Sequence, residues 1–196
     1  KNMQDAEELA EEMVKIGSLA GRNTIAVISD MDEPLGLAVG NALEVAEAVK
    51  TLKKEGPEDL INLCLELGTQ MLIASKVEEN ADKARGMLQN SIDDGSAYNK
   101  FLEFIKRQGG DITVFDDLDE FTECNYKIEV KADKEGYVQR IESELIGEAS
   151  MILGGGRMTK EDVIDYSVGV KLSAKRGDYV KCGDCLATIY AANKDK

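Results

Sequence analysis

Apolar residues recur every three or four positions along much of the first half of the chain, with acidic and basic residues on the remaining positions. This spacing places the apolar side chains on one face of an amphipathic helix. Gly56-Pro57-Glu58-Asp59 marks a further helix start, because proline suits the first turn and acids favour the positive end of the helix dipole. The predicted helices cover residues 3–20, 41–53, 58–72, 78–92, 96–107 and 143–153.

A second pattern, of short apolar or alternating runs bounded by turn residues, predicts strands. Residues 24–29 (TIAVIS) and 112–115 (ITVF) are short apolar runs rich in β-branched residues, as buried strands are. After residue 122 alternating runs follow one another at 125–131, 136–142 and, as strand, turn and strand, 167–190. We therefore predict an α/β fold with a mixed sheet flanked by helices in residues 1–121, and a small β-rich module in 122–196.

Composition removes several functional classes. The 196 residues carry 24 Lys and Arg against 38 Asp and Glu, a formal net charge of −14, so we expect no nucleic-acid partner. The chain has no His, which excludes His-based catalytic triads and His-ligated metals. No apolar run approaches the length of a membrane span, and the acidic residues 1–20 do not resemble a signal peptide. Four Cys are too few for a disulfide scaffold, and we expect a cytoplasmic protein with no membrane partner.

The segment 30–50 is the first candidate for a chemical site. Pro34 and Gly36 interrupt the pattern before the helix 41–53, so an irregular turn is expected to precede helical carboxylates. Carbonyl oxygens of such a turn, with one carboxylate, suit a hard cation. Glu44 and Glu47 both lie off the apolar stripe, and periodicity does not choose between them. The plainer interpretation is a solvated helix face, with Glu47 pairing with Lys50.

Three other features have simpler interpretations. Cys182 and Cys185 form a C-x-x-C in a predicted hairpin, without the helix of a redox pair or the further ligands of a zinc site, so we interpret them as structural. Gly154-Gly155-Gly156-Arg157 lacks the pattern of known phosphate loops, and we expect a hinge or lid. A solvated acidic loop is expected from Asp111, Asp116, Asp117, Asp119 and Glu120.

One long stretch is more specific than any of these motifs. Residues 30–45 read DMDEPLGLAVGNALEV, a pattern that resembles the pyrimidine nucleoside phosphorylase and thymidine phosphorylase family. The resemblance continues through Gly109-Gly-Asp, Lys134-Glu-Gly-Tyr-Val, Gly154-Gly-Gly-Arg and Asp165-Tyr-Ser-Val-Gly, and so covers the whole chain. The family's glycine-rich phosphate-binding segment and pyrimidine-binding residues have no match here. We therefore expect a fragment of the parent enzyme, without catalytic or substrate-binding residues of its own.

The resemblance implies an activity, a cofactor and a partner. Members of this family cleave uridine, thymidine or deoxyuridine with inorganic phosphate as co-substrate, and the parent enzyme is expected to be a homodimer. Some bacterial members hold a potassium ion between domains, and the matching positions here are Leu35, Ala38 and Glu47. The resemblance thus favours Glu47 over Glu44 as a metal ligand. The isolated fragment is expected to be inactive.

The β-rich end also resembles another kind of module. Residues 177–189 (GDYVKCGDCLATI) are similar to half of a lipoyl- or biotinyl-type hammerhead, so we expect a barrel-sandwich hybrid fold for this module. In carrier proteins of that fold a lysine at a hairpin tip bears the cofactor. Lys134 stands only two positions before Gly136 and has no flanking Met residues, so we reject a carrier function. The alternative function from another class is a non-catalytic assembly or binding module.

Overall fold

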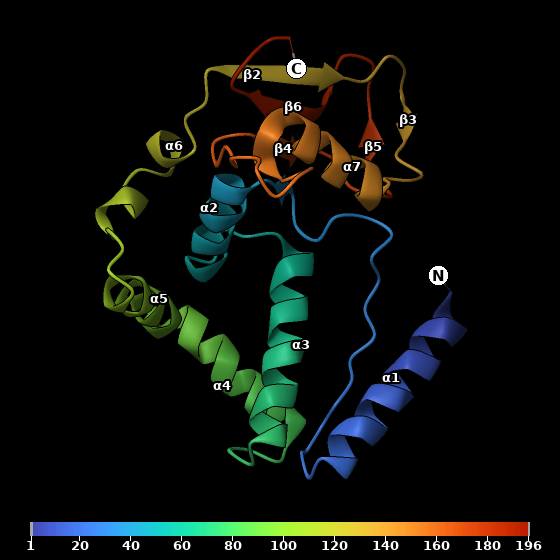
Figure 1. The fold of residues 1–196 in the computed structure, drawn as a ribbon, viewed down its shortest axis with the longest axis vertical. Coiled ribbons are helices and arrows are strands. Elements are labelled where there is room, and N and C mark those ends of the chain that lie inside the picture. Colours follow the sequence, from blue (N-terminus) through green and yellow to red (C-terminus); the bar gives the residue numbers. More distant parts are fainter. Residues whose placement is uncertain (1, 196) are drawn as a thin grey trace.

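The computed structural model describes residues 2–195 (Figure 1). The helices lie close to the predicted stretches, and side chains cap several of them. The Asn2 side chain accepts a hydrogen bond from the Asp5 amide at α1, and Asn80 does the same for Lys83 at α4. The helices are α1 (Met3–Leu19), α2 (Asn41–Leu52), α3 (Glu58–Ala74), α4 (Ala81–Asp93), α5 (Ser96–Arg107), α6 (Leu118–Phe121) and α7 (Ser143–Ser150).

The strands form two sheets in which every described pairing is antiparallel. The larger sheet has the order β1-β4-β6-β2, and the smaller one pairs β3 with β5. The predicted mixed sheet is therefore not found within residues 2–195. The strands are β1 (Ala38–Val39), β2 (Tyr126–Lys131), β3 (Gly136–Tyr137), β4 (Gly169–Leu172), β5 (Tyr179–Val180) and β6 (Cys185–Ala191).

Two predicted strands of the first half are wrong. Residues 24–29 belong to no helix and to no sheet among the described residues. Residues 113–115 instead form the 3₁₀-helix η1 (Thr113–Phe115). Its first turn is set by Asp111, whose carboxylate accepts bonds from the Thr113 amide and hydroxyl. Phe115 is buried between Phe101 and Phe121, and its ring centroid lies 5.2 and 5.5 Å from theirs. This segment is therefore held by the packing of one aromatic ring and not by pairing with a strand.

The second half follows the prediction more closely. The run 125–131 is confirmed as β2, whereas the run 136–142 pairs only over the two residues of β3. The predicted helix 143–153 passes at Met151 into a π-helical turn, η2 (Met151–Gly155), in which Gly154 has a φ of 108°. A residue without a side chain suits that left-handed angle. The barrel-sandwich hybrid arrangement stays a prediction for this module.

The core lies on both faces of the larger sheet. Leu153, Val168 and Leu172 belong to a buried cluster beneath α7 and η2. On the opposite side, Leu43 of α2 packs with Tyr190 of β6 and Ala38 of β1. Strand β1 comes from the first part of the chain and pairs with β4 from the last part, so packing and sheet pairing join these parts. In Figure 1, α2 accordingly sits against the sheet, whereas α3, α4 and α5 extend away from it.

Among the described residues, no helix is long and apolar enough to cross a membrane.

Candidate functional site

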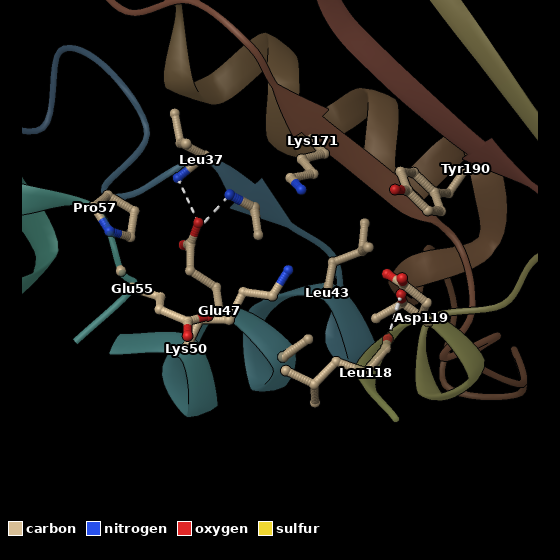
Figure 2. Close-up of a pocket in the computed structure, with 14 residues that line it drawn as sticks. Leu37, Leu43, Glu47, Lys50, Glu55, Pro57, Leu118, Asp119, Lys171 and Tyr190 are labelled. Carbon is tan, nitrogen blue, oxygen red and sulfur yellow. Dashed lines mark hydrogen bonds between the residues drawn. The ribbon is translucent and has the colours of Figure 1, made fainter. Parts of the chain in front are cut away.

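Glu47 of α2 holds the turn that precedes β1. Its carboxylate oxygens accept hydrogen bonds from the backbone amide of Leu37 at 2.9 Å and from that of Ala38 at 3.4 Å, as Figure 2 shows. Helix α2 packs against the sheet through Leu43, and Val49 of the same helix is fully buried, so the carboxylate has a rigid support. The turn is therefore attached to the helix by a charged side chain.

Gly36 makes this approach of the carboxylate possible. A Cβ atom at residue 36 would lie 2.2 Å from the Glu47 Oε2 atom. The φ of Gly36 is +67°, in the left-handed region that favours glycine. The breaker predicted from the sequence is thus required for two reasons, its backbone angle and the space that Glu47 occupies.

The charge of Glu47 is only partly compensated. Burial raises the pKa of Glu47, and the nearby Asp59 carboxylate adds to the increase. The two backbone amides and the Lys171 ammonium oppose it without reversing it. A cation next to this carboxylate would therefore offset an existing cost of burying its charge.

Lys175 holds the other side of the same turn. Its ammonium donates to the backbone carbonyls of Pro34 and Gly36, the latter at 3.0 Å. It also forms an ion pair with the Asp59 carboxylate at 3.0 Å, and Asp59 accepts a bond from the Gly36 amide at 3.0 Å. The Lys175 side chain is 18% exposed, so these contacts are well shielded from water. Glu47 of α2 and Lys175, which lies just before β5, thus both form hydrogen bonds to the backbone of the turn before β1.

The neighbouring Arg176 binds the segment just before this turn. Its guanidinium lies 2.9 Å from an Asp30 carboxylate oxygen, and its backbone amide donates to Glu33 at 3.0 Å. The Arg176 bond helps to lower the pKa of Asp30, after the larger effect of the Asp32 amide. Two consecutive basic residues thus attach to an acidic segment more than 140 positions earlier.

The structure brings the three predicted metal ligands together in one small region. Leu35 lies in the turn, Ala38 begins β1 and is buried, and Glu47 reaches the turn from α2. Within residues 2–195, no group of three His, Cys, Asp or Glu side chains is placed to hold a metal ion. A cation here would depend mainly on backbone oxygens. Two carbonyls and one carboxylate are the hard oxygen donors that suit an alkali metal ion, so the residues fit.

Glu44, the alternative ligand, is used elsewhere. Its carboxylate accepts a hydrogen bond from the Gly40 amide at 3.2 Å and so satisfies the start of its own helix. The two acids that periodicity could not separate therefore have different partners. Asp59 and Lys175 were missed as members of the site, because nothing in local sequence spacing links residues 116 positions apart.

A cavity of about 350 Å³ adjoins Glu47 between α2, α6 and the sheet (Figure 2). Glu47, Lys50 and Lys171 contribute charges of both signs to its wall. Tyr190 and Asp119 close the end furthest from the turn in the view of Figure 2. This mixture of charges gives the cavity no clear preference for an anion or a cation.

The remaining candidate motifs make local contacts. The carbonyls of Gly154 and Gly155 accept bonds from the Asp165 amide and the Asn41 side chain, both at 2.9 Å, and the hinge interpretation stays a prediction. The Cys182 thiol, which is exposed, donates to the Asp133 carbonyl at 3.4 Å. In the acidic loop, Asp117 caps α6 by accepting bonds from two of its amides.

Comparison with known proteins decides the family. A model described as "Glycosyl transferase family, a/b domain" matches residues 1–98, and one described as "Pyrimidine nucleoside phosphorylase C-terminal domain" matches residues 137–196. The chain belongs to the pyrimidine-nucleoside phosphorylase family. Curated pyrimidine-nucleoside phosphorylases from Staphylococcus aureus strains bovine RF122 / ET3-1, USA300 and COL are each 51% identical to it over 195 residues. The match covers the whole of this chain and 45% of each phosphorylase, so the chain spans less than half the length of these relatives.

Proposed function

We propose that the chain forms part of an enzyme that transfers the ribosyl or deoxyribosyl group of a pyrimidine nucleoside to inorganic phosphate. The substrates would be uridine, thymidine and deoxyuridine, and the products the free base and the sugar 1-phosphate. The strongest support for this proposal is that the chain is 51% identical, over 195 residues, to a pyrimidine-nucleoside phosphorylase. In that reaction a phosphate oxygen bonds to the anomeric carbon, and the electron pair of the broken C–N bond leaves with the base.

Catalysis of this kind depends on holding phosphate and sugar in line and on stabilising charge on the leaving base. The contribution proposed for this chain is the rigid turn 33–38. Glu47 and Lys175 fix the backbone of this turn from opposite sides, so the turn can present its carbonyls without reorganising. Because this role is one of support, we propose that the isolated chain is inactive.

Potassium is the cofactor we propose for the intact enzyme. The backbone carbonyls of Leu35 and Ala38 and the carboxylate of Glu47 would hold it. When bound, the ion would supply positive charge that neutralises the half-buried carboxylate and ties the turn to the rest of the enzyme. Burial, the main cause of the raised pKa of Glu47, supports this proposal because a bound cation would offset the cost of burying the carboxylate charge. For the intact enzyme we also propose a homodimer in the cytoplasm.

A chimera tests the proposed function. The matching 195 residues of the Staphylococcus aureus strain COL phosphorylase are replaced by this chain, and release of free base is followed with uridine, thymidine or deoxyuridine and phosphate. We expect turnover within about tenfold of the parent enzyme, and none above a no-protein control from the isolated chain. A chimera that unfolds cooperatively and has the parent's oligomeric size, yet cleaves none of the nucleosides, would contradict the proposal.

A further inference from the structure

Leu35 differs from the other two predicted metal ligands in the way its backbone is held. Ala38 is paired with Lys171 in the sheet, and Glu47 is part of α2. Leu35 lies in the irregular turn before β1, and its side chain is 45% exposed, so burial contributes little to fixing its backbone. The direction of its carbonyl group therefore depends on the hydrogen bonds of the peptide groups around it.

The peptide bond between Leu35 and Gly36 sets the direction of that carbonyl. This bond is trans, so the Leu35 carbonyl and the Gly36 amide point in opposite directions. The Gly36 amide donates to the Asp59 carboxylate at 3.0 Å. The Leu35 carbonyl therefore points away from Asp59.

The peptide group that follows Gly36 shows which side chains lie on each side of the turn. Its carbonyl accepts a bond from Lys175 at 3.0 Å, whereas its amide donates to Glu47 at 2.9 Å (Figure 2). Because Lys175 lies 3.0 Å from Asp59, these two share one side of the turn, and Glu47 lies on the other. The Leu35 carbonyl, which points away from Asp59, thus faces the side that Glu47 occupies.

The Lys175 ammonium has an acceptor for each of its three N–H donors. These acceptors are the Pro34 carbonyl, the Gly36 carbonyl and the Asp59 carboxylate. The carbonyls before and after that of Leu35 are thus both held on the lysine side of the turn. With its donors used in this way, the ammonium is suited to hold the backbone and not to bind a substrate.

The backbone of Lys175 is itself held in a tight turn. Its amide donates to the Asp178 carboxylate at 2.8 Å, and its carbonyl accepts a bond from the Asp178 amide at 3.1 Å. The side chain is mostly buried as well. A lysine that is anchored at both ends has already lost the side-chain freedom that weakens ion pairs on the surface.

We propose that Lys175 and Asp59 are positioning residues that direct the Leu35 carbonyl towards the cation site beside Glu47. This inference rests on the proposed function, because potassium is the ion proposed for that site. Lys175 belongs to the β-rich module and Asp59 to the start of α3, so both parts of the chain determine the shape of the site. Neither side chain is a ligand, and each acts through the backbone.

Charge and positioning make opposite predictions for Lys175. Removal of an ammonium group close to a cation site relieves repulsion, so charge alone predicts that Lys175→Met binds potassium more tightly. Positioning predicts weaker binding, because the Leu35 carbonyl no longer faces the site in every molecule. If the competent orientation falls to about a tenth of the population, the apparent affinity falls by about tenfold.

A potassium titration of the chimera with the Staphylococcus aureus strain COL sequence tests the proposal. The dissociation constant is obtained from the rise in melting temperature as potassium chloride replaces choline chloride at constant ionic strength, so the readout does not depend on turnover. We expect Lys175→Met to raise this constant by about tenfold. Lys181→Met, which removes an exposed ammonium, should leave it unchanged. A constant that is unchanged or lower in Lys175→Met overturns the proposal.

Two substitutions of Asp59 separate its hydrogen bond from its charge, and they also serve if Lys175→Met fails to fold. Asp59→Asn loses the charge but keeps an oxygen that can accept the bond from the Gly36 amide, whereas Asp59→Ala loses both. We expect the potassium dissociation constant of Asp59→Ala to exceed that of Asp59→Asn by about fivefold or more. Equal constants in these two variants overturn the proposal.

The same titration separates this proposal from the proposed function. A chimera that cleaves nucleosides, and that binds potassium equally well with and without Lys175, retains the proposed function and overturns the positioning role. A chimera whose melting temperature does not respond to potassium overturns the potassium site and the positioning role together.

Discussion

Gly40 and Gly169 face each other where β1 meets β4, so closely that a Cβ atom on either one would lie 2.9 Å from the Cα atom of the other. The two backbones can approach in this way only because neither residue has a side chain. Their φ angles of +148° and +156° also lie outside the range that L side chains readily adopt. This contact anchors the end of the turn that carries Leu35 and Ala38.

Alanine at either glycine should therefore destabilise the fold. A Cβ atom at residue 40 would lie 2.5 Å from the Val168 carbonyl oxygen, and one at residue 169 would lie 2.3 Å from that of Val39. We expect Gly40→Ala and Gly169→Ala each to lower the free energy of unfolding by about 2–3 kcal/mol, measured by urea denaturation.

Gly147→Ala is the matched control for these two variants. Gly147 lies in α7, and a Cβ atom there would meet nothing within 4 Å. It should raise the free energy of unfolding by about 0.5–1 kcal/mol, because alanine favours a helix interior. Equal effects at all three glycines would contradict the close contact between β1 and β4.

Removal of the Lys175 ammonium should weaken the turn more than removal of an exposed lysine. Lys175→Met leaves the carbonyls of Pro34 and Gly36 and the Asp59 carboxylate without their common donor. We expect a loss of about 2 kcal/mol in the free energy of unfolding. Lys181→Met, at an exposed position, should change it by less than about 0.5 kcal/mol. Similar urea midpoints for the two variants would show that the turn does not depend on Lys175.

The ion pair between Asp59 and Lys175 should also be visible in the pH dependence of stability. Burial alone would raise the pKa of Asp59, but the bonds from Lys175 and from the Gly36 amide lower it below its usual value of 3.8. A lowered folded-state pKa gives stability that is present above pH 3.8 and is lost as the pH falls through the folded value. Between pH 5.5 and pH 3, the stability difference between the original protein and Asp59→Asn should shrink. A constant difference would contradict the shift.

Two glutamates on α2 allow the proposed potassium site to be tested with a close control. In the chimera, Glu47→Gln should raise the potassium concentration needed for half-maximal turnover by about tenfold, because one charged ligand is lost. Glu44→Gln, whose carboxylate bonds to the Gly40 amide, should leave that concentration unchanged. Choline chloride keeps the ionic strength constant in the titration. The same shift in both variants, or in neither, would argue against Glu47 as a ligand.

Sequence periodicity identified the helices well because the spacing that marks an amphipathic helix depends only on residues three or four positions apart. The strand predictions failed where the local structure depends on residues distant in the sequence or on the packing of one aromatic ring. The run 112–115 has the composition of a strand, yet Asp111 and the burial of Phe115 turn it into η1. The run 24–29 has the right composition too, but composition cannot supply a neighbouring strand.

The candidate site was predicted only in part. Local spacing left Glu44 and Glu47 equivalent, and the family resemblance separated them. In the structure the two acids differ in their contacts, since Glu47 reaches the amides of Leu37 and Ala38 and Glu44 that of Gly40, and the role of Glu47 as a ligand stays a prediction. Lys175 could not be found from spacing, because its partners lie in turns and helix starts of the distant first part of the chain.

The pairing of β1 with β4 has a consequence for synthesis on the ribosome. Ala38 pairs with Lys171, and 171 − 38 gives a separation of 133 positions. At about 5–20 residues per second, β1 waits roughly 7–27 s after its own translation before β4 exists. Lys175 is made later still, so the turn from residue 33 to residue 38 obtains its ammonium partner only when nine-tenths of this sequence has been translated. Up to that moment the nascent turn has the carboxylates of Glu47 and Asp59 as partners for its amides.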